Sequence, residues 1–282
     1  MINIPVGLQL FSVREALAKD HLGTLEKVAQ IGYKNVEFAF HNTSSDGRFE
    51  VEYTAKDLKK SMDTMGLRVV TSHVAHHPNL DWNEVIRYNV ELGSEGVVIP
   101  IYFFKSRQDA IELAKWLNTS GKKCKDSGIQ LYFHNHYHEF QRFEGQSIMD
   151  TLLENTDPEY VSFELDTFWA QRGGVDPVAY MEKLGNRCGL LHQKDLSATA
   201  HPVNLLEKVS GELDADKVFS AFNKEDFVEI GTGIMDIPSI LRKAQELGSV
   251  KYIIVEQDVT VKDELVSVKE SFDNIQKLLM QS

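Results

Sequence analysis

Histidines and carboxylates gather where short apolar runs of this sequence end. The clearest case is "LYFHNHYHEF" (131–140), which begins apolar and aromatic, like the core of a strand, and ends in three histidines and a glutamate. Side chains of these kinds bind metals or transfer protons. The run is therefore a candidate metal site, a candidate acid–base site, or only a polar strand end.

Other apolar runs carry ionisable residues near their carboxyl ends. These are Glu37 in 35–40, His73 in 68–74, Glu164 and Asp166 in 161–167, His192 and Lys194 in 189–195, and Glu256 in 251–257. Residues two apart in a strand share a face, so each of the runs 129–136, 161–167, 189–195 and 251–257 can aim an ionisable group to one side. Burying such groups is costly unless they pair or bind something.

Asp166, His192 and Glu256, with one residue from 131–140, offer a mixed set of nitrogen and oxygen donors. Such a set suits one divalent metal, Mn²⁺, Zn²⁺, Co²⁺ or Fe²⁺. It does not suit a closed structural zinc site, which would favour cysteines. Open coordination positions would let a substrate bind through two oxygens.

Some of these residues could have a purely structural role. His73 taken alone could be a hydrogen-bonded core residue, and Glu37 could be a salt-bridged strand glutamate. The stretch "IGTGIMDIPSIL" (230–241) favours a loop that leads into a helix capped by Asp236. Its alternative is a rim loop that binds an anion at the helix N-terminus.

Eight apolar runs alternate with amphipathic, helix-like stretches. They lie at 6–12, 35–40, 68–74, 96–103, 129–136, 161–167, 189–195 and 251–257. Most begin about 30 residues after the one before, the size of a βα unit. The pattern predicts a (β/α)₈ barrel, an α/β fold, with residues 1–282 as one domain. An open doubly wound sheet is the alternative, but no G-x-G-x-x-G follows the first run. The longer stretch before the eighth run predicts a long loop with at least one extra helix.

Composition excludes several classes of protein. The 282 residues carry a formal net charge of -12, which disfavours a nucleic-acid partner. Two cysteines far apart make a disulfide framework unexpected. Neither a signal peptide nor an apolar run long enough for a membrane span is evident, so we expect a cytoplasmic protein that does not bind membranes. A homo-oligomer is possible.

Several segments resemble those of the xylose-isomerase-like TIM barrels, the sugar-phosphate isomerase/epimerase and inosose dehydratase group related to endonuclease IV. They are "GLQLFSVRE", "FHNHYHEF", "FELDTFWA", "LLHQKDL", "EIGTGIMDIPSIL" and "YIIVEQD", in the family's order over nearly the whole chain. The resemblance is fairly specific for the superfamily and poorly specific for substrate. The acidic net charge counts against an endonuclease, as does His134-Asn135-His136, which stands where the family often has a metal-binding glutamate.

In that family Glu, Asp, His and Glu from successive strands typically hold a divalent metal. Asp166, His192 and Glu256 match the last three. Where the family often has a strand-end glutamate, this chain has His134-Asn135-His136, so either His134 or Glu139 is the expected fourth ligand.

The resemblance implies a metal-dependent sugar isomerase or epimerase that removes a proton next to a carbonyl through a metal-bound enediolate. Glu256 is expected to act as ligand and base, and Glu139 or Glu164 as a separate base. His136 and His73 are expected near substrate oxygens, and Lys194 is expected to neutralise charge on the enediolate. Trp169 and Phe103 are expected to pack against a sugar ring. Glu37 is a further substrate-binding candidate. The expected substrate is a small keto-sugar or polyol. Alternatives are a lyase or hydrolase acting on 3-keto-glycosides or inososes, and a non-catalytic sugar-binding barrel.

Overall fold

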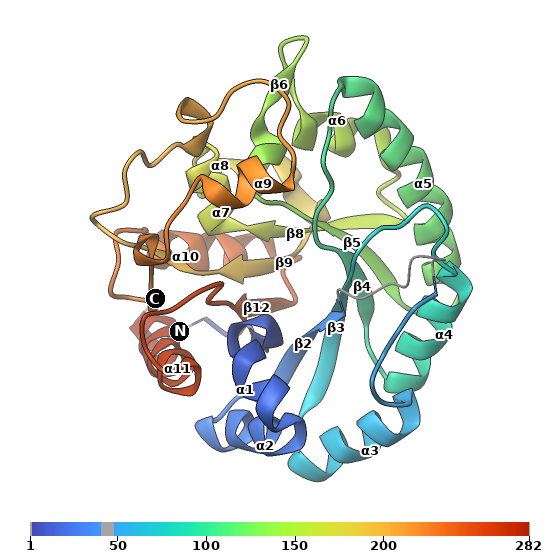
Figure 1. Ribbon diagram of the computed structural model, residues 1–282, viewed down its shortest axis with the longest axis vertical. Coiled ribbons are helices and arrows are strands. Elements are labelled where there is room, and N and C mark those ends of the chain that lie inside the picture. The colour runs from blue at the N-terminus through green and yellow to red at the C-terminus, as the bar shows by residue number, and fades with distance from the viewer. Residues whose placement is uncertain (1, 41–47, 282) are drawn as a thin grey trace.

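The computed structural model describes residues 2–40 and 48–281 and contains a closed barrel of eight parallel strands (Figure 1). The strands follow one another around the barrel in chain order, and the last pairs with the first. They are β1 (Val6–Gln9), β2 (Asn35–Phe40), β3 (Arg68–Val74), β4 (Gly96–Ile99), β5 (Gln130–His134), β8 (Val161–Asp166), β9 (Cys188–Gln193) and β12 (Tyr252–Val255). The expected (β/α)₈ architecture is confirmed.

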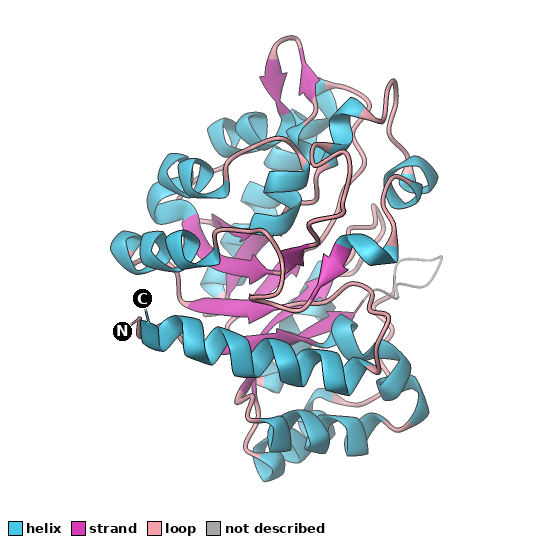
Figure 2. Cartoon of the chain, turned by 90° about the vertical axis from the view of Figure 1, so that its left-hand side faces the viewer, coloured by secondary structure: helices cyan, strands magenta, loops and turns pink. Residues whose placement is uncertain are grey.

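Helices surround the barrel (Figures 1 and 2). The longer ones are α2 (His21–Ile31), α3 (Ala55–Met65), α4 (Trp82–Leu92), α5 (Arg107–Asp126), α6 (Ile148–Asn155), α8 (Pro177–Leu184), α10 (Ile237–Leu247) and α11 (Glu264–Gln281). Their apolar residues recur at helical spacing. In α10, Ile237, Ile240, Leu241 and Ala244 are buried, and the Asp236 side chain caps the first turn.

Shorter elements fill the loops between strands and helices. They are α1 (Arg14–Lys19), α7 (Thr167–Arg172), α9 (Ala215–Ser220), the hairpin β6 (Arg142–Phe143) and β7 (Gln146–Ser147), and the pair β10 (Asp195–Leu196) and β11 (Phe227–Val228). α9 and the β10–β11 pair lie in the long stretch between β9 and β12, where the sequence predicts an extra helix.

An apolar layer fills the barrel interior beneath the carboxyl ends of the strands. It consists of Val70, Val98, Tyr132, Leu190, Tyr252 and Ile254. The Tyr132 ring fits because its neighbours are glycines: a Cβ on Gly96 or Gly189 would lie 2.7 or 2.8 Å from a ring carbon. Two residues further along β5, β9 and β12, on the same face, come His134, His192 and Glu256. The apolar layer therefore supports the polar residues above it.

Some strands are shorter than the sequence predicts. β4 ends at Ile99 rather than at 103, because Pro100 has no N–H to continue the ladder. β5 ends at His134, so His136 lies beyond the strand. The run 6–12 changes after Gln9 into a 3₁₀ helix, η1 (Leu10–Val13).

The two ends of the described chain lie side by side (Figures 1 and 2), and the Ile2 N–H donates to the Leu279 carbonyl at 3.0 Å. Cys124 and Cys188 are buried and unbridged, as expected. Within residues 2–40 and 48–281, no helix combines the length and apolarity needed to cross a bilayer.

Candidate metal centre

Three donors from neighbouring strands converge above the apolar layer. Atoms of Asp166, His192 and Glu256 lie within 4.8 Å of one another, and we call these residues the upper group. His192 Nδ1 is 2.9 Å from Glu256 Oε2. The Lys194 ammonium lies between the two carboxylates, 2.6 Å from Asp166 Oδ2 and 2.7 Å from Glu256 Oε2. An amine cation thus occupies the place where carboxylates from two strands meet.

His134, and not Glu139, adjoins the upper group. His134 Nε2 lies 3.8 Å from Asp166 Oδ2. The Glu139 carboxylate turns back into its own loop, where it accepts the His136 backbone N–H at 2.8 Å and lies 3.2 Å from His138 Nε2. The short 3₁₀ helix His138–Phe140 holds it there.

A second cluster lies directly beneath the upper group and shares His192 with it. This lower group consists of His73, His134, Glu164 and His192. Glu164 Oε2 is 2.8 Å from His73 Nε2, 3.0 Å from His134 Nδ1 and 3.2 Å from His192 Nε2. Glu37 joins it, with Oε1 2.6 Å from His192 Nε2 and 3.0 Å from His73 Nε2.

The two groups together hold an excess of buried negative charge. Five carboxylates, those of Glu37, Glu164, Asp166, Glu256 and Asp258, face Lys194 and the histidines. Glu37, Glu164 and Asp166 have no exposed surface. Since isolated buried charges are very unfavourable, this arrangement favours a cation.

The histidines differ in their pKa values. Burial disfavours the imidazolium form of His73, but Glu37 and Glu164 outweigh it and raise the pKa of His73 to about 9. The pKa of His192 is also raised, because Glu164, Glu37 and Glu256 outweigh burial. Burial and the neighbouring histidines keep the pKa of His134 well below its usual range. A neutral imidazole at His134 is the form that binds metals.

The acidic residues around Lys194 differ as well. Burial raises the pKa of Asp258 to about 7, although the ammonium 3.2 Å away opposes the shift. For Glu256, Lys194 and His192 outweigh burial and lower the pKa. Asp258 thus titrates near neutral pH, whereas Glu256 stays ionised.

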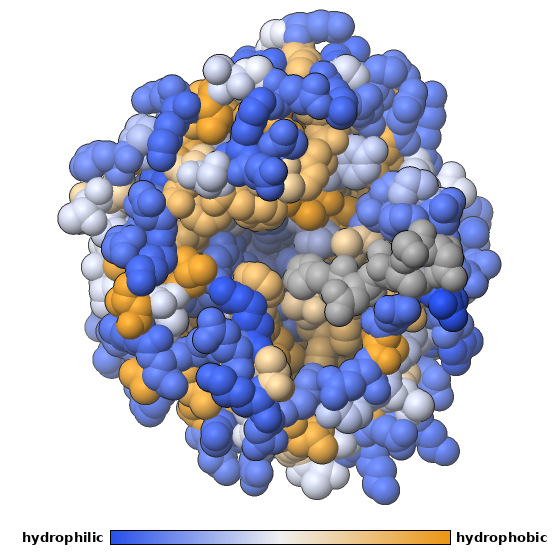
Figure 3. Space-filling model, viewed as in Figure 1, coloured by the Kyte–Doolittle hydropathy of each residue, from blue (hydrophilic) through white to orange (hydrophobic). Residues whose placement is uncertain are grey.

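A cavity of about 400 Å³ opens above the upper group. Its lining residues are Phe11, Arg14, His73, Pro100, Ile101, His134, His136, Trp169, Phe219, Phe222, Glu256, Asp258 and Val259. The space-filling view shows this face hollowed near its centre, with apolar surface along the rim (Figure 3). The cavity places a small ligand within reach of the upper group.

Some predicted substrate contacts line this cavity and others do not. His73, His136 and Trp169 line it. Phe103 does not: its ring stacks on His138 at 5.2 Å, because β4 ends before Pro100 and the expected alternation stops there. Glu37 is fully buried below the cavity and cannot touch a substrate in this structure.

Glu164 is likewise placed differently from the prediction of a separate base. Its carboxylate is fully buried and bonded to histidines, one layer below the cavity. Alternation along β8 puts Glu164 and Asp166 on one face, but Asp166 lies two residues nearer the carboxyl end of the strand, and neither side chain lines the cavity. Sequence spacing gives the face and not the depth.

Eight of the thirteen lining residues lie outside the predicted site: Phe11, Arg14, Pro100, Ile101, Phe219, Phe222, Asp258 and Val259. Asp258 could have been found, because it lies two residues after Glu256. Arg14 begins α1, Phe219 lies in α9 and Phe222 follows α9. All three lie outside the strands, and nothing local in the sequence marks them.

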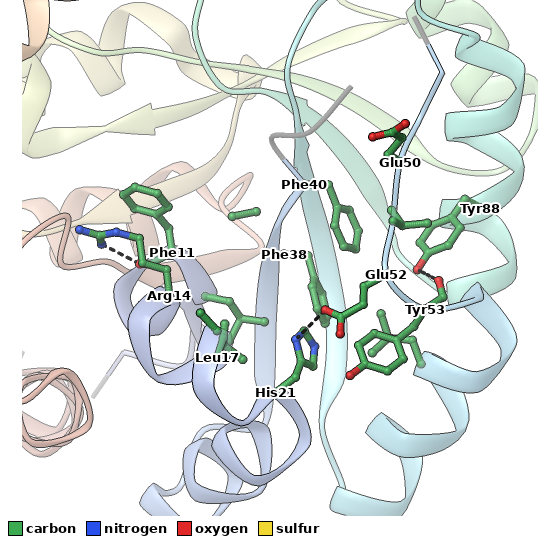
Figure 4. Close-up of a pocket in the computed structure, with 15 residues that line it drawn as sticks. Phe11, Arg14, Leu17, His21, Phe38, Phe40, Glu50, Glu52, Tyr53 and Tyr88 are labelled. Atoms are coloured by element: carbon green, nitrogen blue, oxygen red, sulfur yellow. Dashed lines mark hydrogen bonds and ion pairs between the residues drawn. The ribbon is translucent and has the colours of Figure 1, made fainter. Parts of the chain in front are cut away.

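A second cavity of about 390 Å³ adjoins the first, and Phe11 and Arg14 line both. Figure 4 shows its wall, with the rings of Phe38 and Phe40 at the end of β2. His21 Nδ1 lies 3.9 Å from the Glu52 carboxylate on its lower side.

The loop 230–241 is held by Asp195 rather than left open to an anion. The Asp195 carboxylate accepts backbone N–H groups of Gly231 and Gly233 at 2.9 Å and of Met235 at 3.2 Å. The backbone donors that could bind a phosphate are therefore already occupied by a side chain. This supports the interpretation of 230–241 as a loop that leads into a helix capped by Asp236.

The sequence of the chain matches the family described as xylose isomerase-like TIM barrel over residues 25–278. The chain belongs to this family. The resemblance inferred from the motifs is thereby confirmed. This xylose isomerase-like barrel is also 31% identical over 170 residues to an inosose dehydratase of Geobacillus kaustophilus, a match that covers 59% of this chain and 52% of that protein. The barrel thus spans about half the length of the curated relatives it matches.

Solved structures of similar shape include a sugar phosphate isomerase/epimerase from Parabacteroides distasonis. It is 27% identical, with a TM-score of 0.78, and the match covers 98% of this barrel and 94% of that chain. The IOLI protein, solved with a binding zinc atom, is 13% identical with a TM-score of 0.72, and the match covers 99% of each chain. At that identity the second likeness shows only a shared fold.

Proposed function

We propose that this barrel is a divalent-metal-dependent enzyme that removes a proton next to a carbonyl of a keto-sugar or polyol derivative, and that it acts as an isomerase or epimerase. Its main support is the convergence of Asp166, His192 and Glu256 beside a cavity of about 400 Å³. His134 is the proposed fourth ligand. Two imidazoles and two carboxylates suit Zn²⁺, Co²⁺, Fe²⁺ or Mn²⁺, and the zinc atom of the IOLI protein is consistent with this choice.

A divalent cation held by these residues would polarise the substrate carbonyl as a Lewis acid. Side chains of the barrel then transfer the protons and stabilise the charge. Glu256, which stays ionised, accepts the proton from the adjacent carbon. The Lys194 ammonium stabilises the negative charge that then develops on oxygen. Asp258, with a pKa of about 7, is partly protonated at neutral pH and donates its proton to the enediolate; exchange with solvent then restores the starting protonation states of Glu256 and Asp258.

His136 and Trp169 orient the substrate in this scheme. Burial, together with His138 and Lys194, keeps the pKa of His136 well below its usual range, so the ring is neutral and can donate or accept a hydrogen bond. The Trp169 ring, 5.5 Å from His136, offers an apolar face to a sugar ring. Return of the proton to another carbon, or to the other face, gives an isomer or epimer.

A second candidate keeps the same first step and ends in loss of a leaving group. It is a lyase or hydrolase acting on inososes or 3-keto-glycosides. Two observations favour it: curated relatives are named inosose dehydratase, and the second cavity leaves room for a group attached to the sugar ring. A non-catalytic sugar-binding barrel is the third candidate, but binding alone would not require buried carboxylates at this cost.

The test is hydrogen exchange in heavy water. The protein, loaded in turn with Zn²⁺, Mn²⁺, Co²⁺ and Fe²⁺, is incubated with ketohexoses and inososes, and proton NMR follows loss of the signal next to the carbonyl. We expect hydrogen exchange with at least one combination of metal and substrate, and we expect Asp166→Asn to abolish it. Product mass separates the candidates, since elimination removes water and isomerisation does not. Sugar binding without any exchange would overturn both enzymatic candidates.

A further inference from the structure

The two histidines of the proposed centre each direct one ring nitrogen upward and the other downward. His192 Nδ1 faces Glu256 at 2.9 Å, and its Nε2 faces Glu37 at 2.6 Å. His134 Nε2 faces Asp166 at 3.8 Å, and its Nδ1 faces Glu164 at 3.0 Å. Each ring therefore lies between the upper group and a carboxylate buried beneath it.

The upper and lower groups cannot both hold a metal through neutral imidazoles. A neutral imidazole has one lone pair, on the nitrogen without the proton. A cation in the upper group needs that lone pair on His192 Nδ1 and His134 Nε2. A cation in the lower group needs it on the opposite nitrogens. Filling both would require two bridging imidazolates at once.

Burial and charge separate the two groups. The upper group adjoins the cavity through Glu256, so a metal there can meet a substrate. His73 and His134 of the lower group also line the cavity, but Glu164 and the adjoining Glu37 have no exposed surface and are already paired with His73, at 2.8 and 3.0 Å. The carboxylates beneath the histidines are thus closed off and paired, whereas Asp166, Glu256 and Asp258 share the single ammonium of Lys194.

We infer that Glu164 and Glu37 are positioning residues, which accept the lower N–H of His134 and His192 and so present the upper nitrogens to a single divalent cation. This inference rests on the proposed metal centre. Carboxylates that orient ligand histidines in this way fix the tautomer and the ring plane, and their loss typically costs 10–100-fold in metal affinity.

The two glutamates are not equivalent. Glu37 is also held by Gln9 Nε2 at 2.8 Å and by the Thr71 hydroxyl, so an amide in its place finds a partner that can accept its N–H. Glu164 Oε1 has no partner among the described residues. An amide at 164 would bury an unpaired donor. We therefore expect Glu164→Gln to have the larger effect.

The experiment is metal titration of the metal-free protein with Zn²⁺ and Co²⁺ against a chromophoric chelator, together with the visible spectrum of bound Co²⁺. We expect one equivalent to bind the wild type. Glu164→Gln should bind about 10–100-fold more weakly and change the Co²⁺ spectrum, and Glu37→Gln should show a smaller change in the same direction. Glu95→Gln is the matched control: Glu95 accepts the Tyr252 hydroxyl at 2.7 Å, away from both groups, and should leave affinity unchanged.

Three outcomes are decisive. Two tight equivalents in the wild type would overturn the inference, as would unchanged affinity and spectrum in both glutamine variants. Asp166→Asn tells the failures apart: if it loses metal while both glutamine variants bind normally, only the inference fails. If Asp166→Asn binds metal like the wild type, the proposed centre itself is misplaced. Should Glu164→Gln not fold, Glu37→Gln carries the test.

Discussion

At the scale of single residues, Glu139 shows how burial alone can control a charge. Its carboxyl group has no exposed surface. Burial raises the pKa of Glu139 to about 8 and lowers that of His138 beside it to about 4, so both are uncharged at neutral pH. An unfolded glutamate titrates near 4.3. Because the folded state holds the Glu139 proton more tightly than the unfolded chain does, the contribution of Glu139 to stability falls as the pH rises from about 4.3 to about 8.

Glu139→Gln should remove this loss, because glutamine does not titrate and its carbonyl can still accept the His136 N–H. We expect the variant's advantage over wild type to grow between pH 5 and pH 8, to about 3 kcal/mol in the free energy of unfolding. Urea denaturation at several pH values measures it. Glu154→Gln, at an exposed position on α6, is the control and should show little advantage at any pH. An advantage that does not depend on pH would contradict the shifted pKa.

His134 is the proposed fourth ligand, and its imidazole has a consequence for metal choice. His134→Glu would turn a set of two imidazoles and two carboxylates into one with three carboxylates. Harder oxygen donors favour Mn²⁺ over Zn²⁺. We expect the preference for Zn²⁺ over Mn²⁺ to fall roughly tenfold, about 1.4 kcal/mol.

Competition titration with both metals measures this preference. His134→Gln, which adds no charge beside Glu164, is the control for simple loss of the imidazole: it should weaken both metals without moving the preference toward Mn²⁺. A preference that stays the same in His134→Glu would mean that residue 134 does not touch the metal.

At the scale of elements, Asp195 joins the end of β9 to the loop that begins α10. Asp195→Ala would leave four backbone donors without their acceptor, those of Leu196, Gly231, Gly233 and Met235. We expect a loss of about 3 kcal/mol in the free energy of unfolding. Asp236→Ala removes an exposed cap of α10 in the same loop and should cost about 1 kcal/mol. Equal losses in the two variants would show that Asp195 does not anchor the loop.

The strands show how far sequence alone reaches. All eight barrel strands overlap the runs predicted from apolar composition, because parallel barrel strands are buried on both faces. Their ends were less predictable. Pro100 ends β4 early, and Phe103 therefore does not line the cavity. The position of Phe103 in the run 96–103 predicts that it would. Alternation predicts which face of a strand a residue lies on, but its depth in the barrel depends on the register between strands. The sequence therefore predicts substrate contact for Glu37 and Glu164, whereas the structure buries both.

At the scale of the whole molecule, the family and the barrel could be predicted because their signals are spread along the entire chain. The upper wall of the cavity could not be predicted from the sequence. Phe219 and Phe222 come from the long insertion between β9 and β12, and only the fold brings them opposite His136. Long-range pairing of this kind leaves no periodic trace in the sequence.

Metal should stabilise the whole barrel, since the donors proposed to hold it, Asp166, His192 and Glu256, come from three different strands. At a free metal concentration about 100 times Kd, binding adds about 2.7 kcal/mol, which corresponds to a rise of roughly 5 °C in Tm for a chain of this size. Calorimetry with metal and with excess chelator measures it. Asp166→Asn should show no such difference. Identical Tm values for the wild type with and without Zn²⁺, Mn²⁺, Co²⁺ or Fe²⁺ would contradict a metal at this site.

The position of the Lys194 ammonium, between Asp166 and Glu256 and 3.2 Å from Asp258, has a consequence for how the protein matures. A newly made chain carries its own counter-ion and can close the barrel before any metal reaches it. Binding of the proposed metal would then exchange one cation for another at Asp166 and Glu256, and would leave Lys194 with Asp258 as its remaining carboxylate partner.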